Sequence, residues 1–198
     1  MPTNTIKFEH SDFYIYLVED DVSQRESIES ILNFIGYNIS SFSNANAFLK
    51  NKIQRPGVLV TDMQMPDISG VELQEQLIQL NIDIPIIFIS GEASISQSIK
   101  AMQQGAIDFL VKPFDADQLI QVVKKACGLD AKKIYLKELL ETLSPRELEV
   151  YKLLNEGLNN NELIDKLKLS LPTVKQYKSE VMRKLKIKTL SELIHLSR

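Results

Sequence analysis

Between residues 14 and 126, five short apolar segments rich in β-forming residues alternate with five segments of helical periodicity. The expected strands are 14–18, 37–42, 58–60, 86–89 and 107–110. The expected helices are 23–35, 44–51, 70–80, 95–104 and 115–126. Three of the strand segments are almost continuously apolar, which is typical of strands buried on both faces. The alternation predicts an α/β domain with a parallel sheet covered by helices on both sides.

The strand pattern stops at Cys127, and the chain that follows has helical periodicity only. From residue 137 onward, apolar residues recur at spacings of three and four, which predicts a module of about four helices. Ser144, Pro145 and Glu147 form a capping signature, so a helix should begin near residue 145. We therefore divide the chain into an α/β domain at 12–127, a linker at 128–141 and an all-α domain at 142–198.

Charge is distributed unevenly between these two domains. Residues 1–127 hold 9 Lys and Arg against 16 Asp and Glu, whereas residues 142–198 hold 11 against 7. This asymmetry suggests that an acidic module is joined to one that tolerates polyanions. The longest apolar runs are about six residues, whereas roughly twenty are needed to cross a bilayer, and residues 1–12 lack the apolar core of a signal peptide. We therefore expect a cytoplasmic protein with no membrane partner.

Acidic residues follow two of the predicted strands, at the ends where parallel sheets bind ligands. Glu19, Asp20 and Asp21 follow the first strand, and Asp62 follows the third. In a flavodoxin-like strand order of 2-1-3-4-5 these strands are neighbours, so Glu19, Asp20 and Asp62 should converge on one pocket. Three close carboxylates repel one another, and Mg²⁺ relieves that repulsion by taking carboxylate oxygens as ligands. The sequence therefore predicts a Mg²⁺ site.

Two further polar residues follow the last strands of the predicted sheet. Ser90 comes after the fourth strand and Lys112 after the fifth. A lysine opposite the carboxylates can pair with them or with an oxyanion, and a serine hydroxyl can donate a hydrogen bond to the same oxyanion. We therefore expect the pocket to combine acidic, basic and hydroxyl groups.

Four ordered motifs in residues 14–126 resemble the receiver domain of two-component response regulators. They are Val18 to Asp21, Thr61 to Gly70, Ile89 to Gly91 and Asp108 to Phe114. The resemblance implies a (βα)5 fold and a phosphoryl group donated by a phosphohistidine on a separate sensor histidine kinase. It also implies that the chain is a regulator and not an enzyme, apart from Mg²⁺-dependent self-phosphorylation and slow autodephosphorylation.

The resemblance implies a role for each residue of the acidic pocket. Asp62 is the expected phosphoryl acceptor, Asp20 a direct Mg²⁺ ligand, and Glu19 a ligand that acts through water. The backbone carbonyl of Gln64 completes the expected protein ligands. These assignments follow from the positions that match the family motifs in this sequence.

Three residues outside the acidic group also take roles from the resemblance. Lys112 is expected to offset the negative charge that gathers at the transferring phosphoryl group. The peptide between Lys112 and Pro113 is expected to be cis. Ser90 and Phe109 resemble the family's switch pair, in which the hydroxyl moves towards the phosphoryl group and the ring fills the space it leaves.

Residues 142–198 resemble the LuxR-type helix-turn-helix domain, the output module of FixJ/NarL-like regulators. The motifs that carry the resemblance are Leu143 to Val150, Glu156 to Leu163, Leu169 to Lys178 and Val181 to Leu185. Ser170 is expected to cap the recognition helix, while Val174, Val181 and Leu185 should face inward. The opposite face is then polar and basic, as a helix in the major groove requires.

The polar face of this helix supplies the expected DNA contacts. Lys175 and Gln176 are expected to read base edges. The expected phosphate contacts are Thr173, Lys178, Arg183 and Lys184. Ser179 lies on the same face. The polar face favours double-stranded DNA with promoter half-sites as a partner. The family resemblance further implies RNA polymerase and a second copy of the chain, which pairs through residues 94–114 after phosphorylation.

Two other functional classes stay open on the sequence alone. An aspartyl-phosphate phosphohydrolase also uses a nucleophilic aspartate on a parallel sheet, but those enzymes generally carry a second aspartate two residues on, where this chain has Gln64. The other alternative is a protein that binds partners other than DNA, or that binds DNA without phosphorylation. No motif names the kinase, the operator or the direction of regulation.

Overall fold

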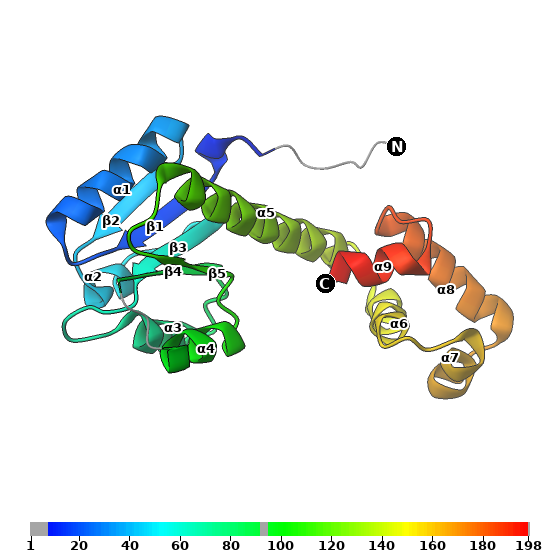
Figure 1. Ribbon diagram of the computed structural model, residues 1–198. Helices are drawn as coiled ribbons and strands as arrows, with labels where there is room; N and C mark the ends of the chain where they lie inside the picture. The colour runs from blue at the N-terminus through cyan, green and yellow to red at the C-terminus, as the bar shows by residue number, and fades with distance from the viewer. Residues whose placement is uncertain (1–7, 92–94, 198) are drawn as a thin grey trace. The chain divides into compact units, whose positions relative to one another are not determined.

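The computed structural model describes residues 8–91 and 95–197, and the chain divides into two compact units between Lys132 and Lys133. In the described part of the first unit, five parallel strands form a sheet in the order β2-β1-β3-β4-β5 (Figure 1). The strands are β1 (Tyr14–Val18), β2 (Asn38–Phe42), β3 (Gly57–Asp62), β4 (Ile86–Ser90) and β5 (Asp108–Val111). The predicted strand order is confirmed.

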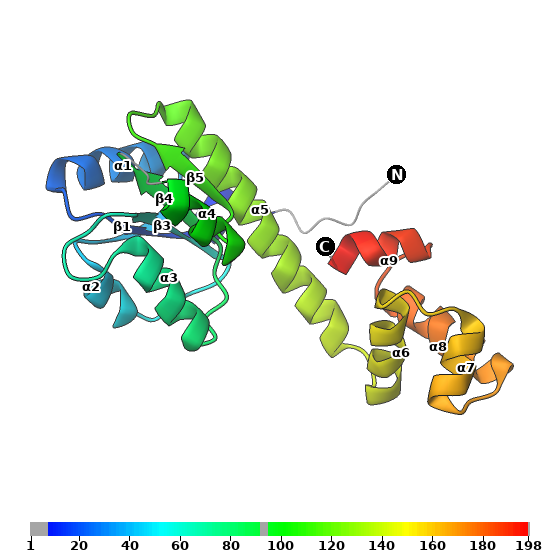
Figure 2. The same cartoon turned by 60° about the horizontal axis from the view of Figure 1, so that its bottom comes forward.

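Helices cover both faces of this sheet (Figure 2). They are α1 (Val22–Ile35), α2 (Ala45–Leu49), α3 (Gly70–Gln79), α4 (Ile95–Gln103) and α5 (Ala116–Glu141). Successive residues of β1 point to opposite faces. Ile15 and Leu17 join a core with α1 and α5, whereas Tyr16 and Val18 join a core with α2, α3 and α4. This burial on both sides explains why the strand segments are almost continuously apolar.

Helix α5 is longer than the sequence pattern predicts. The expected end at residue 126 is wrong, because the helix continues to Glu141 and the segment expected to be a linker, 128–141, is helical. Gly128 suggests a break in the sequence, but one glycine costs a helix only about 1 kcal/mol relative to alanine. Tertiary packing offsets that cost, since Leu119 lies in the core of the first unit and Leu139 in the core of the second.

Asp130 is a fully buried acid that fixes α5 to the sheet. Its carboxylate accepts hydrogen bonds from the Arg55 guanidinium, through Nε at 2.8 Å and through Nη2, and from the Gly57 N–H at 2.8 Å. Arg55 also donates to the Asp83 carbonyl oxygen. These contacts tie the helix to the segments that lead into β3 and β4.

Within residues 133–197, four helices enclose a second core. They are α6 (Pro145–Asn155), α7 (Asn160–Leu167), α8 (Leu171–Lys184) and α9 (Leu190–Ser197). The predicted start of α6 is confirmed, since the Glu147 N–H donates to the Ser144 hydroxyl at 3.3 Å and the Ser144 N–H donates to the Glu147 carboxylate at 2.7 Å. Val174, Val181 and Leu185 are buried, as predicted.

Ser170 immediately precedes α8, but its side chain does not cap the helix as predicted. Its hydroxyl is hydrogen-bonded to the Thr173 hydroxyl at 2.8 Å and to no backbone N–H of α8. The two hydroxyl groups are hydrogen-bonded to each other. The sequence therefore predicts where α8 starts, but not which hydrogen bond the Ser170 side chain forms. None of the helices in the described parts of the chain has both the length and the apolar character needed to cross a membrane.

Candidate functional site

The predicted acidic pocket lies where β1 and β3 end. These strands are parallel neighbours, and Val18 is paired with Thr61. Glu19, the residue after β1, and Asp62, the last residue of β3, are therefore adjacent. Both are buried, whereas Asp20 is exposed. One carboxylate oxygen from each of Glu19, Asp20 and Asp62 lies within 4.8 Å of the others.

This set of oxygens suits a hard divalent cation, because Mg²⁺ binds carboxylates together with water and phosphate oxygens. Asp21, the third acid of the run, has another role. Its carboxylate accepts a hydrogen bond from the Gln24 N–H at 2.8 Å and caps α1. The residues that can hold an ion are therefore Glu19, Asp20 and Asp62.

Lys112 follows β5 and pairs with two of the carboxylates. Its Nζ donates to Asp62 Oδ2 at 2.6 Å and to Glu19 Oε2 at 2.9 Å. Its backbone N–H donates to the Ser90 carbonyl oxygen at 2.7 Å. The peptide between Lys112 and Pro113 is cis, as predicted. The lysine side chain thus extends past β4 to reach the acids at the ends of β3 and β1.

Burial and pairing have opposite effects on ionisation in this pocket. Burial raises the pKa of Glu19 above its ordinary value, and the hydrogen bond from Lys112 opposes that rise. Burial also favours the neutral form of Lys112, but the hydrogen bonds and the charge attraction of Asp62 and Glu19 together outweigh burial and raise the pKa of Lys112. Lys112 is therefore a cation at neutral pH and can bind an anion that enters the pocket.

The loop after β3 lies close to Asp62. The Gln64 N–H donates to Asp62 Oδ1 at 2.8 Å, two residues beyond the acid. Gly70, the first residue of α3, has no room for a side chain. A Cβ there would overlap the Asp62 carbonyl oxygen and lie 3.1 Å from the Phe88 ring. Only a glycine lets α3 begin against the backbone of Asp62.

We expect Gly70→Ala to destabilise the first unit by about 1–3 kcal/mol, because the added methyl group forces α3 away from β3. Urea unfolding followed by circular dichroism measures the change. Gly128→Ala is the matched control, since a Cβ at Gly128 meets nothing within 4 Å and alanine favours a helix by about 1 kcal/mol. Equal unfolding midpoints for the two variants would contradict the packing argument.

Ser90 ends β4, and Phe109 lies in the neighbouring strand β5. Ser90 is fully buried, and its Oγ has no hydrogen-bond partner among the residues that the structure describes. Phe109 is half-buried and packs against the core shared by α2, α3 and α4. A buried hydroxyl without a partner costs free energy. The Ser90 hydroxyl is therefore available to donate to an acceptor that enters the pocket.

Arg25 contacts the acidic loop, although its position in the sequence gives it no evident role. Its Nη1 donates to the carbonyl oxygens of Glu19 at 2.6 Å and Asp20 at 3.3 Å. Backbone carbonyls are present at every residue, so such a contact leaves no signal in a side-chain pattern. Among the site residues, Arg25 and Gly70 owe their roles to contacts with the backbone.

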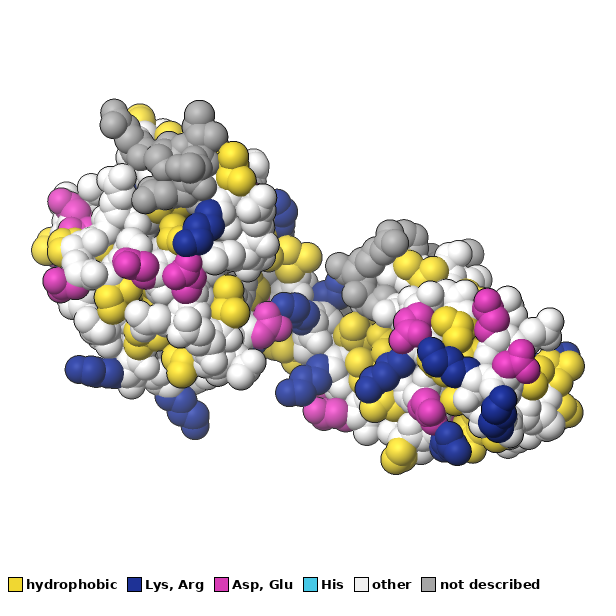
Figure 3. Space-filling view, turned by 90° about the horizontal axis from the view of Figure 1, so that it is seen from below, with side chains coloured by type: hydrophobic (Ala, Val, Ile, Leu, Met, Phe, Trp, Pro, Cys, Tyr) yellow, Lys and Arg dark blue, Asp and Glu magenta, His cyan; other side chains and the backbone are white. Residues whose placement is uncertain are grey.

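The expected DNA-contacting residues lie on α8. Those with exposed side chains are Lys175, Gln176, Ser179 and Arg183. Thr173 and Lys178 are half-buried, and Lys178 Nζ donates to Asn160 Oδ1 of α7 at 3.3 Å. Figure 3 shows Lys and Arg side chains interspersed with Asp and Glu on the visible face of the helical unit. The exposed part of α8 therefore supplies both cationic and neutral polar groups.

Two of the expected phosphate contacts are already paired with acids. Arg183 Nη2 donates to Glu180 Oε2 at 2.8 Å on the surface of α8. Lys184 is more buried than Arg183. Its Nζ donates to Glu147 Oε2 at 2.6 Å and to the Thr142 carbonyl oxygen at 3.2 Å. The hydrogen bond from Lys184 is the main cause that lowers the pKa of Glu147, whose side chain is buried. The pair joins the end of α8 to the start of α6. Lys184 therefore contributes to the fold of the helical unit, and its expected contact with a DNA phosphate stays a prediction.

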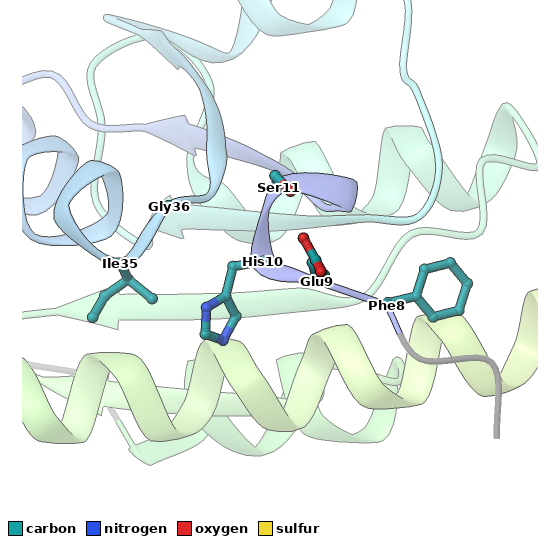
Figure 4. Close-up of a pocket in the computed structure, with 6 residues that line it drawn as sticks. All are labelled: Phe8, Glu9, His10, Ser11, Ile35 and Gly36. Atoms are coloured by element: carbon teal, nitrogen blue, oxygen red, sulfur yellow. The ribbon is translucent and has the colours of Figure 1, made fainter.

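A hollow near the amino end of the described chain is separate from the acidic pocket. Its lining residues are Phe8, Glu9, His10, Ser11, Ile35 and Gly36 (Figure 4). These residues precede β1 and β2, so they lie at the end of the sheet opposite Asp62. The His10 ring packs on Tyr37 with centroids 4.9 Å apart. Glu9 is the single acid among these lining residues and none of them is a lysine, so the hollow does not reproduce the acidic pocket.

The sequence matches two family models that together span both units. The response regulator receiver domain matches residues 15–124, and the model for bacterial regulatory proteins of the luxR family matches residues 141–197. Nodulation protein W of Bradyrhizobium diazoefficiens is 39% identical over 193 residues, which cover 92% of this chain and 84% of that protein. Transcriptional regulatory protein FixJ of Rhizobium meliloti is 35% identical, with 94% and 96% covered.

A solved structure leads to the same family. The response regulator StyR matches with a TM-score of 0.59 and 34% identity, over 94% of this chain and 98% of that one. The sequence resemblance to receiver and LuxR-type domains is thereby confirmed along nearly the whole chain. The chain belongs to the FixJ/NarL-like response regulators, transcriptional regulators of two-component systems that join a receiver domain to a LuxR-type DNA-binding domain.

Proposed function

We propose that Asp62 accepts a phosphoryl group from a phosphohistidine of a sensor histidine kinase in the cytoplasm. An Asp62 carboxylate oxygen forms the new P–O bond while the P–N bond of the donor breaks and the imidazole leaves with the electron pair. The observation that carries the proposal is the position of Asp62, which is buried, 2.6 Å from Lys112 Nζ, and within 4.8 Å of two further carboxylates. Both reactants are anions, so the reaction needs positive charge beside Asp62, which Lys112 supplies and which a cation held by the carboxylates would add to.

The residues around Asp62 would bind the cation and contact the phosphoryl oxygens. Glu19, Asp20, Asp62 and the Gln64 carbonyl would hold Mg²⁺, with Glu19 acting through water, and the bound ion offsets charge on the transferring phosphoryl group. Lys112 exchanges its contact with Asp62 for one with a phosphoryl oxygen. The Ser90 hydroxyl, which has no partner among the described residues, donates to another phosphoryl oxygen, and Phe109 fills the space that Ser90 leaves. Self-phosphorylation from small donors and slow autodephosphorylation use the same groups.

Phosphorylation then controls assembly and DNA binding. The receiver pairs with a second copy through α4 and β5, where Ile99, Met102 and Val111 are exposed apolar residues. Pairing brings two LuxR-type domains to adjacent half-sites of a promoter, where RNA polymerase can be engaged. A modification shifts such an equilibrium only as far as it favours one state over the other.

Light scattering with and without Mg²⁺ and beryllofluoride, a phosphoryl mimic, tests the link between the pocket and assembly. We expect the wild-type mass to rise from monomer to dimer and the mass of Asp62→Asn to stay unchanged. An unchanged wild-type mass, with beryllofluoride binding verified by ¹⁹F NMR, would rule out phosphorylation-driven dimerisation. Regulation would then have to act by release of the DNA-binding domain.

We also propose that α8 contacts DNA through Thr173, Lys175, Gln176, Lys178, Ser179, Arg183 and Lys184. Lys175→Ala should cost about 1–3 kcal/mol of binding and relax specificity at one base, whereas Lys178→Ala should weaken binding to all duplexes and reduce the salt slope by about 1. Fluorescence anisotropy on a duplex selected from a random library measures both effects. Lys152→Ala, an exposed lysine of α6, is the charge-matched control. If Lys175→Ala and Lys178→Ala lost no more affinity than Lys152→Ala, α8 would not be the DNA-contacting helix.

A further inference from the structure

One arginine holds the backbone of the acidic loop. Arg25 lies in the first turns of α1 and is half-buried. Its Nη1 donates to the carbonyl oxygens of two consecutive residues, Glu19 at 2.6 Å and Asp20 at 3.3 Å. Its own N–H donates to the Asp21 carbonyl oxygen at 3.0 Å as the first bond of the helix. The arginine thus engages the peptide groups of the loop that carries two of the three clustered carboxylates.

Glu19 and Asp20 differ in the contacts that hold them. The Glu19 N–H donates to the Phe42 carbonyl oxygen of β2 at 3.1 Å, and its side chain is paired with Lys112. Asp20 has neither anchor: among the described residues, no hydrogen bond or ion pair holds its carboxylate. The backbone therefore decides where the Asp20 side chain starts, and Arg25 holds the carbonyl of that backbone.

The hydrogen bonds of Arg25 also direct its positive charge at the loop backbone and not at the carboxylates. Arg25 forms no ion pair with the described acids of the pocket, because its guanidinium is directed at carbonyl oxygens. The carboxylate oxygens of Glu19, Asp20 and Asp62 can therefore still accept a cation. A residue that binds the backbone of ligand residues in this way acts as an outer-shell partner, and loss of such a partner typically lowers metal affinity 10–100-fold.

We propose that Arg25 is a positioning residue for the divalent-cation site. It fixes the peptide groups of Glu19 and Asp20 so that the Asp20 carboxylate faces Asp62 before an ion arrives. The inference rests on the proposed cation site and adds to it the residue that preorganises the loop. Charge alone has the opposite effect, because a nearby guanidinium repels a cation. Positioning therefore predicts weaker binding without Arg25, whereas a purely electrostatic role predicts tighter binding.

Titration calorimetry with Mn²⁺ and with Mg²⁺ on the full chain tests the inference. Arg25→Met keeps the length of the side chain and removes its donors, and we expect the affinity to fall about 10-fold. Arg25→Lys restores one donor group and should recover part of the loss. Gln24→Met, an exposed change one residue earlier, is the matched control and should bind as the wild type does. Unchanged or tighter binding by Arg25→Met would overturn the positioning role.

A kinetic measurement distinguishes positioning from a general loss of structure. With a small-molecule phosphodonor, Arg25→Met should need about 10-fold more Mg²⁺ for half-maximal phosphorylation, with the wild-type rate at saturating Mg²⁺. A lower rate at every Mg²⁺ concentration would indicate a damaged fold and overturn the inference. If the wild type itself bound no divalent cation, the proposed function would fail. If the wild type and Arg25→Met bound equally, only the role of Arg25 would fail.

Discussion

Asp62→Asn should abolish phosphorylation, whereas the wild-type chain should take up a single phosphoryl group. The reason is chemical, because an amide oxygen carries too little charge to attack phosphorus and the amide no longer pairs with Lys112 as an acid does. In the structure, Asp62 holds Lys112 Nζ at 2.6 Å through one oxygen and the Gln64 N–H at 2.8 Å through the other. Intact mass spectrometry after incubation with Mg²⁺ and a small phosphodonor gives the stoichiometry directly.

Asp67→Asn is the matched control for this prediction. Asp67 lies in the same loop, is exposed, and has a positive φ of 69°, a conformation that asparagine also adopts readily. It should be labelled as the wild type is. Labelling of Asp62→Asn at the wild-type level would disprove the assignment of the acceptor. Continuous release of inorganic phosphate by the wild type would instead favour the phosphohydrolase alternative.

Arg55→Met should lower the free energy of unfolding of the receiver domain by about 3–5 kcal/mol. The change leaves the fully buried Asp130 carboxylate with the Gly57 N–H as its remaining donor among the contacts described above. Asp130→Ala should cost less, because the Arg55 side chain is 30% exposed and can turn to water. Urea unfolding gives the magnitudes, and hydrogen exchange at β3 and in the middle of α5 locates the effect in the receiver.

The double variant Arg55→Met with Asp130→Leu separates charge from packing. Removing both charges together avoids an unpaired buried ion, so the double variant should lose less stability than Arg55→Met alone. Lys124→Ala, an exposed change six residues before Asp130 on α5, is the control and should leave the unfolding midpoint unchanged. If the double variant were less stable than both single variants, the unpaired charge of Asp130 would not be the main cause of the loss in Arg55→Met.

Much of the receiver could be predicted because its determinants are local. Apolar runs buried on both faces specify strands. Glu19 and Asp62 stand at the ends of β1 and β3, and they meet because these strands are neighbours in the sheet. The start of α6 followed from Ser144, Pro145 and Glu147, whose hydrogen bonds lie within four residues of chain. The same local logic was insufficient at Ser170, where the nearby hydroxyl of Thr173 took the place of the helix amide.

The remaining features depend on groups that meet only in the folded chain. Arg55 and Asp130 are 75 residues apart, and Lys184 is 37 residues from Glu147, so neither pair has a signature in sequence spacing. Packing against Leu119 and Leu139 keeps α5 helical through Gly128.

The sequence by itself determined the fold class and the acids that follow the strands, because hydrophobic periodicity and strand-end residues can be read along the chain. The strand order that brings those acids together was taken from the flavodoxin-like arrangement, and the structure confirms it. Only the tertiary structure decided which partners the charged side chains have. It pairs Lys184 internally, directs Arg25 to two carbonyl oxygens, and leaves no room for a side chain at Gly70. The physical reason is that burial and hydrogen bonding depend on the distances between groups in space.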